Sequence, residues 1–236
     1  GVGTLGKALI VPQVALSLVL LLGAGLLLRT FESLRTSNPG FQKADVLQVN
    51  LYPRPEGYKN LDMNGYRRQL LERLASVPGV LSVSFSNLPV PAGESGWRDT
   101  VSLLAADSPP GASPLTTLAV VSPGFFKTLG IPLVSGRDFD WTDDEQHPRV
   151  AIIDSNLARR LLPSGDVIGE RIRFGVQPEF QDLDIVGVAR SARLVDLRNR
   201  NMPVVHVPCL QHPKYSQYGN VFVRAKHPGA LARTVE

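Results

Sequence analysis

The sequence predicts one membrane-spanning helix followed by a mixed α+β domain. Three observations support this fold class: an uncharged apolar run at residues 8–28, a strand–helix–strand pattern at residues 46–86, and further short strands separated by turn residues. Charged residues make up 19% of the 236 positions and apolar residues 43%. This balance excludes disordered and disulfide-rich classes of protein. The single cysteine, Cys209, excludes an internal disulfide.

The apolar run at residues 8–28 contains 21 positions without a charge. At ~1.5 Å per residue, such a helix spans roughly 31 Å, which matches the ~30 Å hydrocarbon core of a bilayer. A secretory signal has an apolar core of only ~7–15 residues and a small-residue cleavage site, and a buried core helix would be shorter and would carry a polar stripe. The run therefore predicts a membrane-spanning helix, with Pro12 in its first turn, where proline costs little.

Residues 29–34 contain no Gly or Pro, so the helix is expected to continue past the membrane surface and to end before Pro39. Only Lys7 precedes the helix, whereas basic residues such as Arg29 and Arg35 follow it. By the positive-inside rule, this distribution would place the large domain in the cytoplasm. The count leaves topology open, because further upstream charges are expected before residue 1.

A strand–helix–strand unit is expected at residues 46–86. Its two strands show alternating apolar residues, which is typical of strands with one buried face. The alternating residues are Leu47, Val49 and Leu51 in the first strand and Leu81, Val83 and Phe85 in the second. Between the strands, apolar residues recur every three or four positions from Met63 to Val77, which predicts an amphipathic helix. Pro78 and Gly79 end it. A strand beginning at residue 220 is expected to join the same unit.

The packing of this unit follows from the two patterns. The helix is expected to cover one face of the strands with its apolar residues and to turn its charged residues toward solvent. The covered residues are Leu47, Val49, Leu81 and Val83, the covering residues are Met63, Tyr66, Leu70 and Leu74, and the outward residues are Arg67, Arg68, Glu72 and Arg73.

A short helix is predicted at residues 122–130. Ser122 is expected to cap its first amides, Pro123 to occupy the first helical position, and Gly130 to end it in the left-handed conformation.

A second helix is predicted after a strand at residues 150–153, with Asp154 or Ser155 as its cap. This helix contains Leu157, Leu161 and Leu162. The remaining strands are expected at residues 101–105, 118–121, 172–174, 184–189, 204–207 and 221–224, and a last helix at residues 230–236.

The glycines near the N-terminus resemble the sequence pattern of a phosphate-binding loop. Gly1, Gly6 and Lys7 fit the P-loop pattern G-x-x-x-x-G-K-[ST], and Gly3 adds a G-x-G-x-x-G pattern. The position that must supply a Mg²⁺-binding hydroxyl is Ala8, no strand precedes the glycines, and the apolar helix follows at once. We therefore predict a flexible approach to the membrane there, with no nucleotide and no other cofactor bound.

Two other groups of residues suggest a metal site. His206, Cys209 and His212 form an H-x₂-C-x₂-H pattern, but prolines interrupt the segment and a fourth zinc ligand is missing. An acidic run from Asp143 to Glu145, with His147 nearby, is predicted to be a surface loop with solvated charges. Neither group is predicted to bind a metal.

A local group of arginines follows the strand at residues 184–189 and consists of Arg190, Arg193, Arg198 and Arg200. Nucleic-acid binding would require interleaved aromatic residues or a known docking element, and the patch contains Asp196 instead. The sequence thus predicts no nucleic-acid partner. It also predicts no catalytic, cofactor-binding or metal-binding residue anywhere in the chain.

Six segments carry more information together than any of them does alone. They are VPQVALSLVLLLGAGLLLRTF at 11–31, NPGF at 38–41, LERLASVPGVLSVSFSNLP at 71–89, VVSPGFFKTLGIPLVSGRDF at 120–139, VAIIDSNLARRLLPSGDVIGERI at 150–172 and DIVGVARSARLVDLR at 184–198. In this order they resemble the membrane helix and extracytoplasmic core domain of MacB-like ABC transporter permeases, the FtsX-type family. The opening helix most resembles the one that begins the second half of the large duplicated acidobacterial permeases.

The resemblance implies a MacB-like periplasmic core domain, in which a porter-like β-α-β subdomain carries a smaller inserted α/β subdomain. The boundaries it implies are 1–7 for a cytoplasmic-side flank, 8–28 for the transmembrane helix, 29–40 for a helix extension and linker, 41–140 and 218–236 for a C-terminally truncated porter-like subdomain, and 141–217 for the inserted subdomain.

The resemblance also implies a function in efflux or export, without enzymatic activity in this chain. The domain would transmit to cargo or partner proteins the movement that a separate cytoplasmic ABC ATPase produces. Residues 40–236 would lie outside the cytoplasmic (inner) membrane, in the periplasm, against the local charge count. The other implied partners are a second permease or permease half and membrane lipid, with room for a periplasmic adaptor or an outer-membrane protein.

Two alternatives from other functional classes stay open at this point. One is a single-pass sensor or adaptor whose outer domain binds a ligand or a protein, and an upstream cytoplasmic signalling module would favour it. The other is a membrane-anchored enzyme, which requires a convergent polar cluster in a pocket. Further spanning helices after residue 236 would favour the permease.

Overall fold

The computed structural model describes residues 2–36, 39–42, 44–52, 62–93, 95–104, 113–163, 165–175, 181–195, 202–215 and 217–226. The chain forms two compact units, Gly1–Asn38 and Pro39–Glu236.

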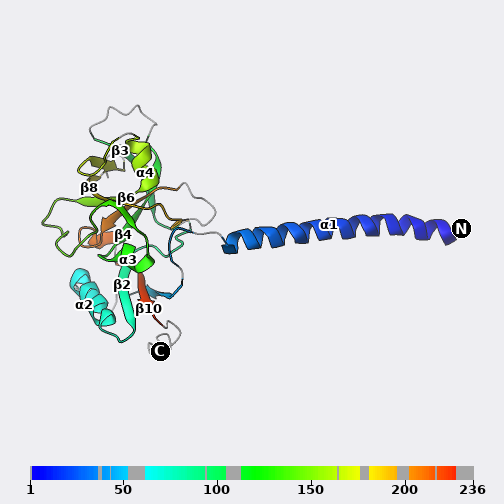
Figure 1. Cartoon of the computed structure of the whole chain (residues 1–236), viewed down its shortest axis with the longest axis horizontal. Coiled ribbons are helices and arrows are strands. Elements are labelled where there is room, and N and C mark those ends of the chain that lie inside the picture. Colours follow the sequence, from blue (N-terminus) through cyan, green and yellow to red (C-terminus); the bar gives the residue numbers. More distant parts are fainter. Residues whose placement is uncertain are drawn as a thin grey trace. The chain divides into compact units, whose positions relative to one another are not determined.

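The first unit is a single helix, α1, which runs from Val2 to Thr36 (Figure 1). Its stretch from Pro12 to Glu32 is long and apolar enough to cross a membrane, with a mean hydropathy of 2.1 and none of its length buried in the structure. The helix predicted for residues 8–28, and its continuation through residues 29–34, are confirmed. The prediction that Pro12 lies in the first turn is wrong, because the helix begins at Val2 and Pro12 is inside it.

The second unit contains ten strands, three α-helices and one short 3-10 helix among its described residues. The strands are β1 (Val46–Leu51), β2 (Val80–Ser86), β3 (Trp97–Leu103), β4 (Leu115–Val121), β5 (Leu133–Gly136), β6 (Val150–Asp154), β7 (Arg171–Phe174), β8 (Gln181–Ala189), β9 (Val204–Pro208) and β10 (Gly219–Ala225). The helices are α2 (Met63–Ala75), α3 (Phe125–Leu129), α4 (Ser155–Leu161) and the 3-10 helix η2 (Pro213–Tyr215).

Each strand expected from the sequence overlaps one of these strands, whereas β5 and η2 were not predicted. The helix predicted for residues 230–236 lies outside the described residues.

Six of the strands form a closed ring in the order β4-β3-β7-β8-β6-β9, because β9 pairs in parallel with β4. Alternate residues from all six strands lie in one buried core, as expected when a sheet closes on itself. These residues are Val101, Leu103, Leu118, Val120, Ala151, Ile153, Ile172, Phe174, Leu183, Ile185, Val205 and Val207. Closure leaves these strands without the unpaired edges that an open sheet has.

The other large element is a three-stranded antiparallel sheet in the order β1-β10-β2. It joins the ring where Ser86 of β2 pairs with Val121 of β4. The strand–helix–strand unit is therefore confirmed, with β10 from near the other end of the chain inserted between its two strands.

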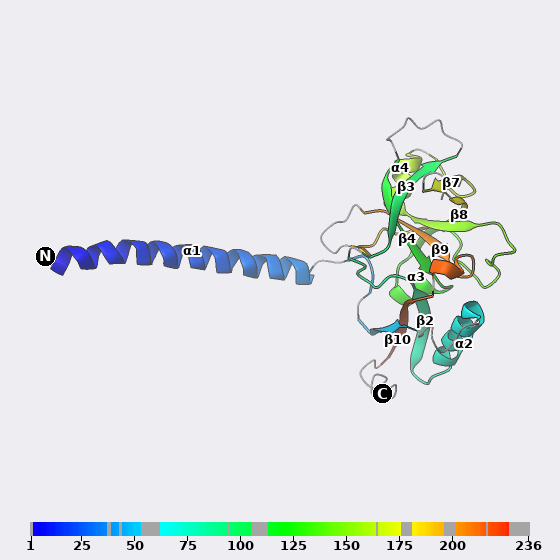
Figure 2. The same cartoon turned by 180° about the vertical axis from the view of Figure 1, so that it is seen from behind.

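Two helices pack against this three-stranded sheet. Figures 1 and 2 both show α2 alongside β2, which it contacts, and α3 contacts β2 and β10. The guanidinium of Arg67 in α2 lies over the Phe85 ring, whereas Phe125 of α3 contacts Phe222. Phe85 and Phe222 project from opposite faces, because Phe85 pairs with Val221, the neighbour of Phe222. The two helices thus cover opposite faces of the sheet.

The predicted inner face of α2 is partly wrong. Arg67 is only 1% exposed and Leu71 is 5% exposed, so these two residues point into the core, and Leu70 and Leu74 are half-buried beside them. Arg67 was expected to face solvent, but its aliphatic stem packs well in an apolar site when the guanidinium finds a partner. Here the partners are the Phe85 ring, whose centroid lies 4.5 Å from the Arg67 guanidinium carbon, and the Asn64 side-chain oxygen, which accepts from the guanidinium at 3.1 Å.

The predicted strand face is partly wrong as well. Leu47 and Val83 pack against the core, but Val49 is 49% exposed and Leu81 is 51% exposed. Val49 is exposed because β10 lies between β1 and β2, whereas Leu81 lies where the pairing of β2 with β10 shifts its register. Helix α2 packs on β2, so the outer strand β1 receives less cover than a directly paired strand would.

The prediction that Ser122 caps a helix and Pro123 begins it is wrong. Helix α3 starts at Phe125, and its N-cap is Gly124 in the left-handed conformation. The Ser122 hydroxyl instead accepts a hydrogen bond from the Phe85 amide at 2.9 Å, which ties β4 to β2. The end of the helix is as predicted, because Gly130 adopts a φ of 65°.

Candidate functional site

The possible zinc ligands lie in different surroundings. His206 is buried against the rings of Phe125 and Phe126, and its Nδ1 lies 3.2 Å from the Ile152 carbonyl oxygen. Burial lowers the pKa of His206 to about 4. Among the described residues, no group of three His, Cys, Asp or Glu side chains is placed to hold a metal ion.

The other two members of this pattern are buried elsewhere. Cys209 is fully buried, and burial is the main cause that raises the pKa of its thiol, with the Arg67 charge acting in the opposite direction. His212 lines a surface cavity.

The acidic run divides into residues with different roles. Asp143, predicted to be solvated, is only 4% exposed and binds the Arg137 guanidinium through both oxygens at 2.7 and 2.8 Å. It also accepts the Asp140 amide at 3.0 Å, so it holds the turn after β5. Asp144 contacts His147 at 2.8 Å, and this hydrogen bond lowers the pKa of Asp144. Glu145 is exposed, as predicted.

The two remaining patterns are placed as follows. Residues 2–8 of the P-loop-like sequence are helical as part of α1, so the flexible approach predicted there is wrong. A P-loop requires an open turn that cradles phosphates. Of the arginine patch, Arg190 is exposed and Arg193 half-buried, and Arg198 and Arg200 lie outside the described residues.

A feature that sequence reasoning missed is the attachment of residues 39–42, here called the entry segment, to the folded domain. This segment follows α1 in the chain after two residues. The Pro39 carbonyl accepts the Arg193 amide at 2.7 Å, and the Gln42 amide donates to the Leu129 carbonyl at 2.8 Å. Phe41 between them is 9% exposed and packs in the core that contains α3.

Gly40 fits the entry segment closely against the loop after β8. Its φ is +84°, and a Cβ at this position would lie 2.9 Å from the Ser191 carbonyl oxygen and 3.0 Å from the Ala192 Cα. Both are backbone atoms, which cannot rotate away as a side chain would. Only glycine therefore suits both the backbone conformation and the space.

Arg224 of β10 holds the entry segment from the other side. Its guanidinium donates to the Thr128 carbonyl at 2.8 Å and to the Gln42 carbonyl at 3.4 Å. The segment is thus attached to the loop after β8, to the end of α3 and to the three-stranded sheet.

Asp154 connects the loop after β8 to the strand ring. One carboxylate oxygen accepts the amides of Asn156 and Leu157 at 2.7 and 2.9 Å, which caps α4 as predicted, and it also accepts the Ser191 hydroxyl at 2.9 Å. The other oxygen accepts the Val204 amide of β9 at 2.7 Å. Asp154 is 5% exposed. One buried carboxylate therefore joins β6, α4, β9 and the loop that contacts Gly40.

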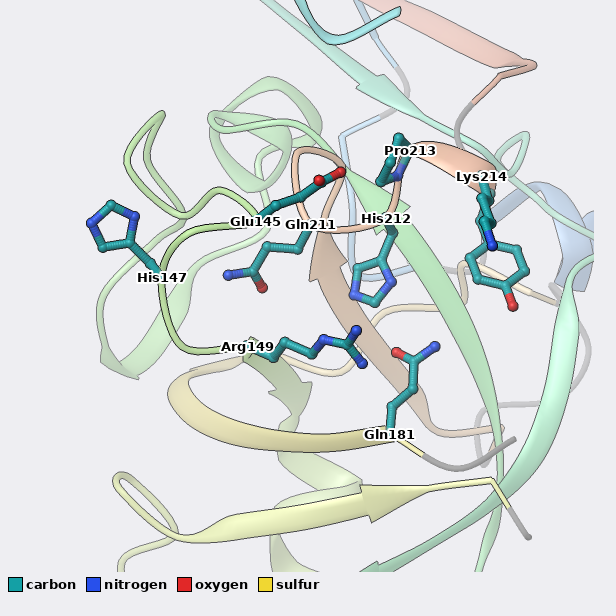
Figure 3. Close-up of a pocket in the computed structure, with 9 residues that line it drawn as sticks. Glu145, His147, Arg149, Gln181, Gln211, His212, Pro213 and Lys214 are labelled. Atoms are coloured by element: carbon teal, nitrogen blue, oxygen red, sulfur yellow. The ribbon is translucent and has the colours of Figure 1, made fainter. Parts of the chain in front are cut away.

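A polar cavity of about 430 Å³ opens elsewhere on the domain (Figure 3). Gln211 fixes its wall, because its side-chain oxygen accepts the Val150 amide and its nitrogen donates to the Asp144 and Pro148 carbonyls. Burial, and secondly the Arg149 charge, lower the pKa of His212 to about 4, so this ring is neutral near pH 7. The residues that line the cavity are Glu145, His147, Arg149, Gln181, Gln211, His212, Pro213, Lys214 and Tyr215.

Sequence reasoning considered Glu145, His147 and His212 of this cavity, but as metal ligands. It missed Arg149, Gln181 and Lys214, because they come from three separate parts of the chain and match no motif. No signal in the sequence would have brought them together.

Comparisons with known proteins identify a family and two solved structures with a similar fold. Residues 11–236 match the family described as the MacB-like periplasmic core domain. The periplasmic region of MacB from Actinobacillus actinomycetemcomitans superposes with a TM-score of 0.55 at 11% identity, over 86% of this chain and 85% of that one. The extracellular domain of the noncanonic ABC-type transporter YknZ from Gram-positive bacteria gives 0.50 at 18% identity, over 80% and 88%. No curated protein matches.

Proposed function

Because the chain belongs to the family of MacB-like periplasmic core domains, we propose that it transmits mechanical movement in an ABC-type efflux or export permease. In this proposal a separate cytoplasmic ATPase moves α1, and the folded domain passes that movement to cargo or to a partner protein. The chain itself neither binds nor hydrolyses ATP. The chain is a MacB-like periplasmic domain of an ABC-type transporter permease. Its described residues include one helix apolar enough to cross a membrane, which is consistent with a membrane anchor.

The attachment of the entry segment supports this proposal most directly. Helix α1 continues without interruption to Thr36, and the domain begins at Pro39. From Pro39 to Gln42, backbone hydrogen bonds and a buried Phe41 attach the chain to two different parts of the domain. A force on this segment acts directly on the domain, because the hydrogen bonds on both sides would have to break before the segment could move alone.

The strand ring is suited to carry the movement onward. A closed ring has no edge strand that can separate alone, and Asp154 bonds it to the loop that contacts Gly40. The ring and the entry segment therefore move together as long as the Asp154 bonds persist.

The location and partners belong to the same proposal. Residues 40–236 lie on the periplasmic side, and the partners are the cytoplasmic ABC ATPase, a second permease or permease half, and a periplasmic adaptor or outer-membrane protein. The division into a porter-like subdomain at 41–140 and 218–236 and an inserted one at 141–217 also remains a proposal.

The test is a flexible insertion between the membrane helix and the domain. In the full-length permease with its ATPase, Gly-Gly inserted after Ser33 breaks the regular helix before the entry segment. We expect export to be lost while expression and basal ATPase activity remain. The same insertion after the exposed Pro163, beyond α4, serves as the control and should leave export intact. Full export by the Ser33 insertion variant would contradict the proposal.

A further inference from the structure

The cavity beside η2 contains cationic side chains that no described ion pair uses. The five ion pairs among the described residues involve Arg68, Arg137, His147, Arg171 and Arg173. Arg149 and Lys214, which both line the cavity, take part in none of them. Arg171 and Arg173 are paired with Asp184 and Asp182 across the sheet, whereas Arg149 faces a concave surface without such a pair in the described part of the chain.

The side chains at the cavity converge on one point. Figure 3 shows Arg149, Gln181 and His212 directed toward one another, whereas Glu145 and His147 point away from this convergence. His147 is occupied by Asp144 at 2.8 Å. The Arg149 guanidinium supplies the charge at the convergence, because the His212 ring is neutral and Glu145, the acidic residue that lines this cavity, is directed elsewhere.

Gln181 adds a requirement for a hydrogen-bond donor. Its side-chain oxygen is buried, and it has no hydrogen-bond partner among the described residues. A buried carbonyl oxygen without a donor is unfavourable, so a ligand that supplies an N–H or O–H would satisfy it. An anion without a hydrogen-bond donor, such as sulfate, would satisfy Arg149 but not this oxygen.

The cavity wall is fixed before any ligand arrives. Gln211 bonds to three backbone groups between residues 144 and 150, which holds the chain on either side of Arg149. The Tyr215 ring lies 5.4 Å from the Trp97 ring and 6.4 Å from the His212 ring, so η2 is packed against its neighbours. A preorganised site loses less entropy when it binds.

We propose that this cavity binds a carboxylate whose neighbouring atoms carry an N–H or O–H donor. Arg149 pairs with the carboxylate, which its planar guanidinium suits, Lys214 adds a second positive charge, and the Gln181 oxygen accepts the neighbouring donor. Either the end of a peptide chain or a small hydroxy acid carries these groups. A second cavity of about 550 Å³ shares Glu145, Pro213 and Lys214 with the first and gives room for the rest of a longer ligand.

The experiment uses the full chain in detergent micelles, with the side-chain amide signal of Gln181 followed by NMR. The probes are N-acetyl-alanyl-alanine, the same dipeptide with a C-terminal amide, and lactate. We expect the free acid to shift the Gln181 signal and to bind at least about tenfold more tightly than the amide. Lactate separates the two sources: binding as tight as the dipeptide's assigns a small hydroxy acid, and weaker binding assigns a chain end.

Variants decide whether Arg149 is responsible. Arg149→Gln should remove the preference for the free acid, and Lys214→Gln should reduce it. Arg190→Gln is the matched control, because Arg190 is an exposed arginine at the opposite end of the β6–β8 pair, in which Val150 pairs with Asp184 and Asp154 with Ala189. Equal affinity for acid and amide, or an unchanged preference in Arg149→Gln, would overturn the proposal. Because binding is measured without transport, a failure of the transmission mechanism would not affect this result.

Discussion

The entry segment and the polar cavity are two regions of one domain with opposite construction. At the entry segment, backbone hydrogen bonds attach the chain to the domain, and Gly40 has no room for a Cβ. The buried carboxylate of Asp154 bonds to the neighbouring loop. At the cavity, side chains such as Arg149 and Lys214 line open space and join no ion pair among the described residues. The difference fits the two proposals, in which the first region holds the chain in place and the second binds a ligand.

The largest expected effect is at Asp154. Asp154→Ala removes the acceptor of four hydrogen bonds and leaves buried donors unpaired, so it should lower the free energy of unfolding by about 4 kcal/mol. Asp62→Ala is the matched control, because Asp62 caps α2 with a single bond to the Asn64 amide and is exposed. We expect a loss of about 1 kcal/mol there. Urea unfolding measures both, and equal losses would remove the special role of Asp154.

The next effect separates a close fit from backbone strain. Gly40→Ala should cost about 3 kcal/mol, because alanine is strained at a φ of +84° and its Cβ would meet the Ser191 and Ala192 backbone. Gly79 has a φ of +89° with open space around its Cβ position. Gly79→Ala should therefore cost only about 1 kcal/mol. If the two variants unfold at the same denaturant concentration, Gly40 is not held as described.

A pH dependence is expected from His206, which packs beside α3 on the entry-segment side. The unfolded chain protonates this histidine near pH 6.5, whereas the folded domain does so near pH 4. Between these values the unfolded state binds more protons, so stability falls as the pH is lowered from about 6.5 and levels off below about 4.

His206 should account for about 3 kcal/mol of the stability that the domain loses between about pH 6.5 and about pH 4. His206→Phe should reduce the decrease in stability across this pH range by about that amount, as measured by urea unfolding at several pH values. An unchanged decrease would show that His206 does not titrate in this way.

The smallest stability effect is predicted on the cavity side. Arg149 is exposed and joins no ion pair among the described residues, so Arg149→Gln should change the free energy of unfolding by less than about 0.5 kcal/mol. Thermal unfolding with and without the substitution measures it. A loss comparable to that of Asp154→Ala would mean that the cavity, too, is part of the structural framework.

The sequence predicted local structure better than it predicted long-range neighbours. Each segment with alternating apolar residues forms a strand, as predicted. Asp154 was one of two predicted caps, because capping depends on residues only a few positions away. β10, by contrast, pairs between β1 and β2 from more than 130 positions away, and no local pattern encodes that order. This is why Val49 was expected to be covered by α2 and is instead half exposed.

Side-chain chemistry explains the other errors. Arg67 was assigned to the surface because it is charged, but its stem packs in the core and its head lies over Phe85. Ser122 has the right residue type for a cap, yet its hydroxyl bonds to a neighbouring strand. The contact between Gly40 and Ser191 and the convergence of Arg149 with Gln181 join residues that no motif connects, so neither region could be found before the fold was known.

The central claim is that the entry segment and the strand ring move as one body, and a distance measurement tests it directly. Spin labels are placed at Ala44→Cys, just after the entry segment, and at Arg190→Cys, after β8, in the full-length permease with its ATPase. Both positions are exposed, and the native Cys209 is fully buried. The distance distribution between the labels should be the same in the nucleotide-free and ATP-trapped states of an export-competent permease. A shift between the two states would show that the segment moves within the domain and would contradict the claim.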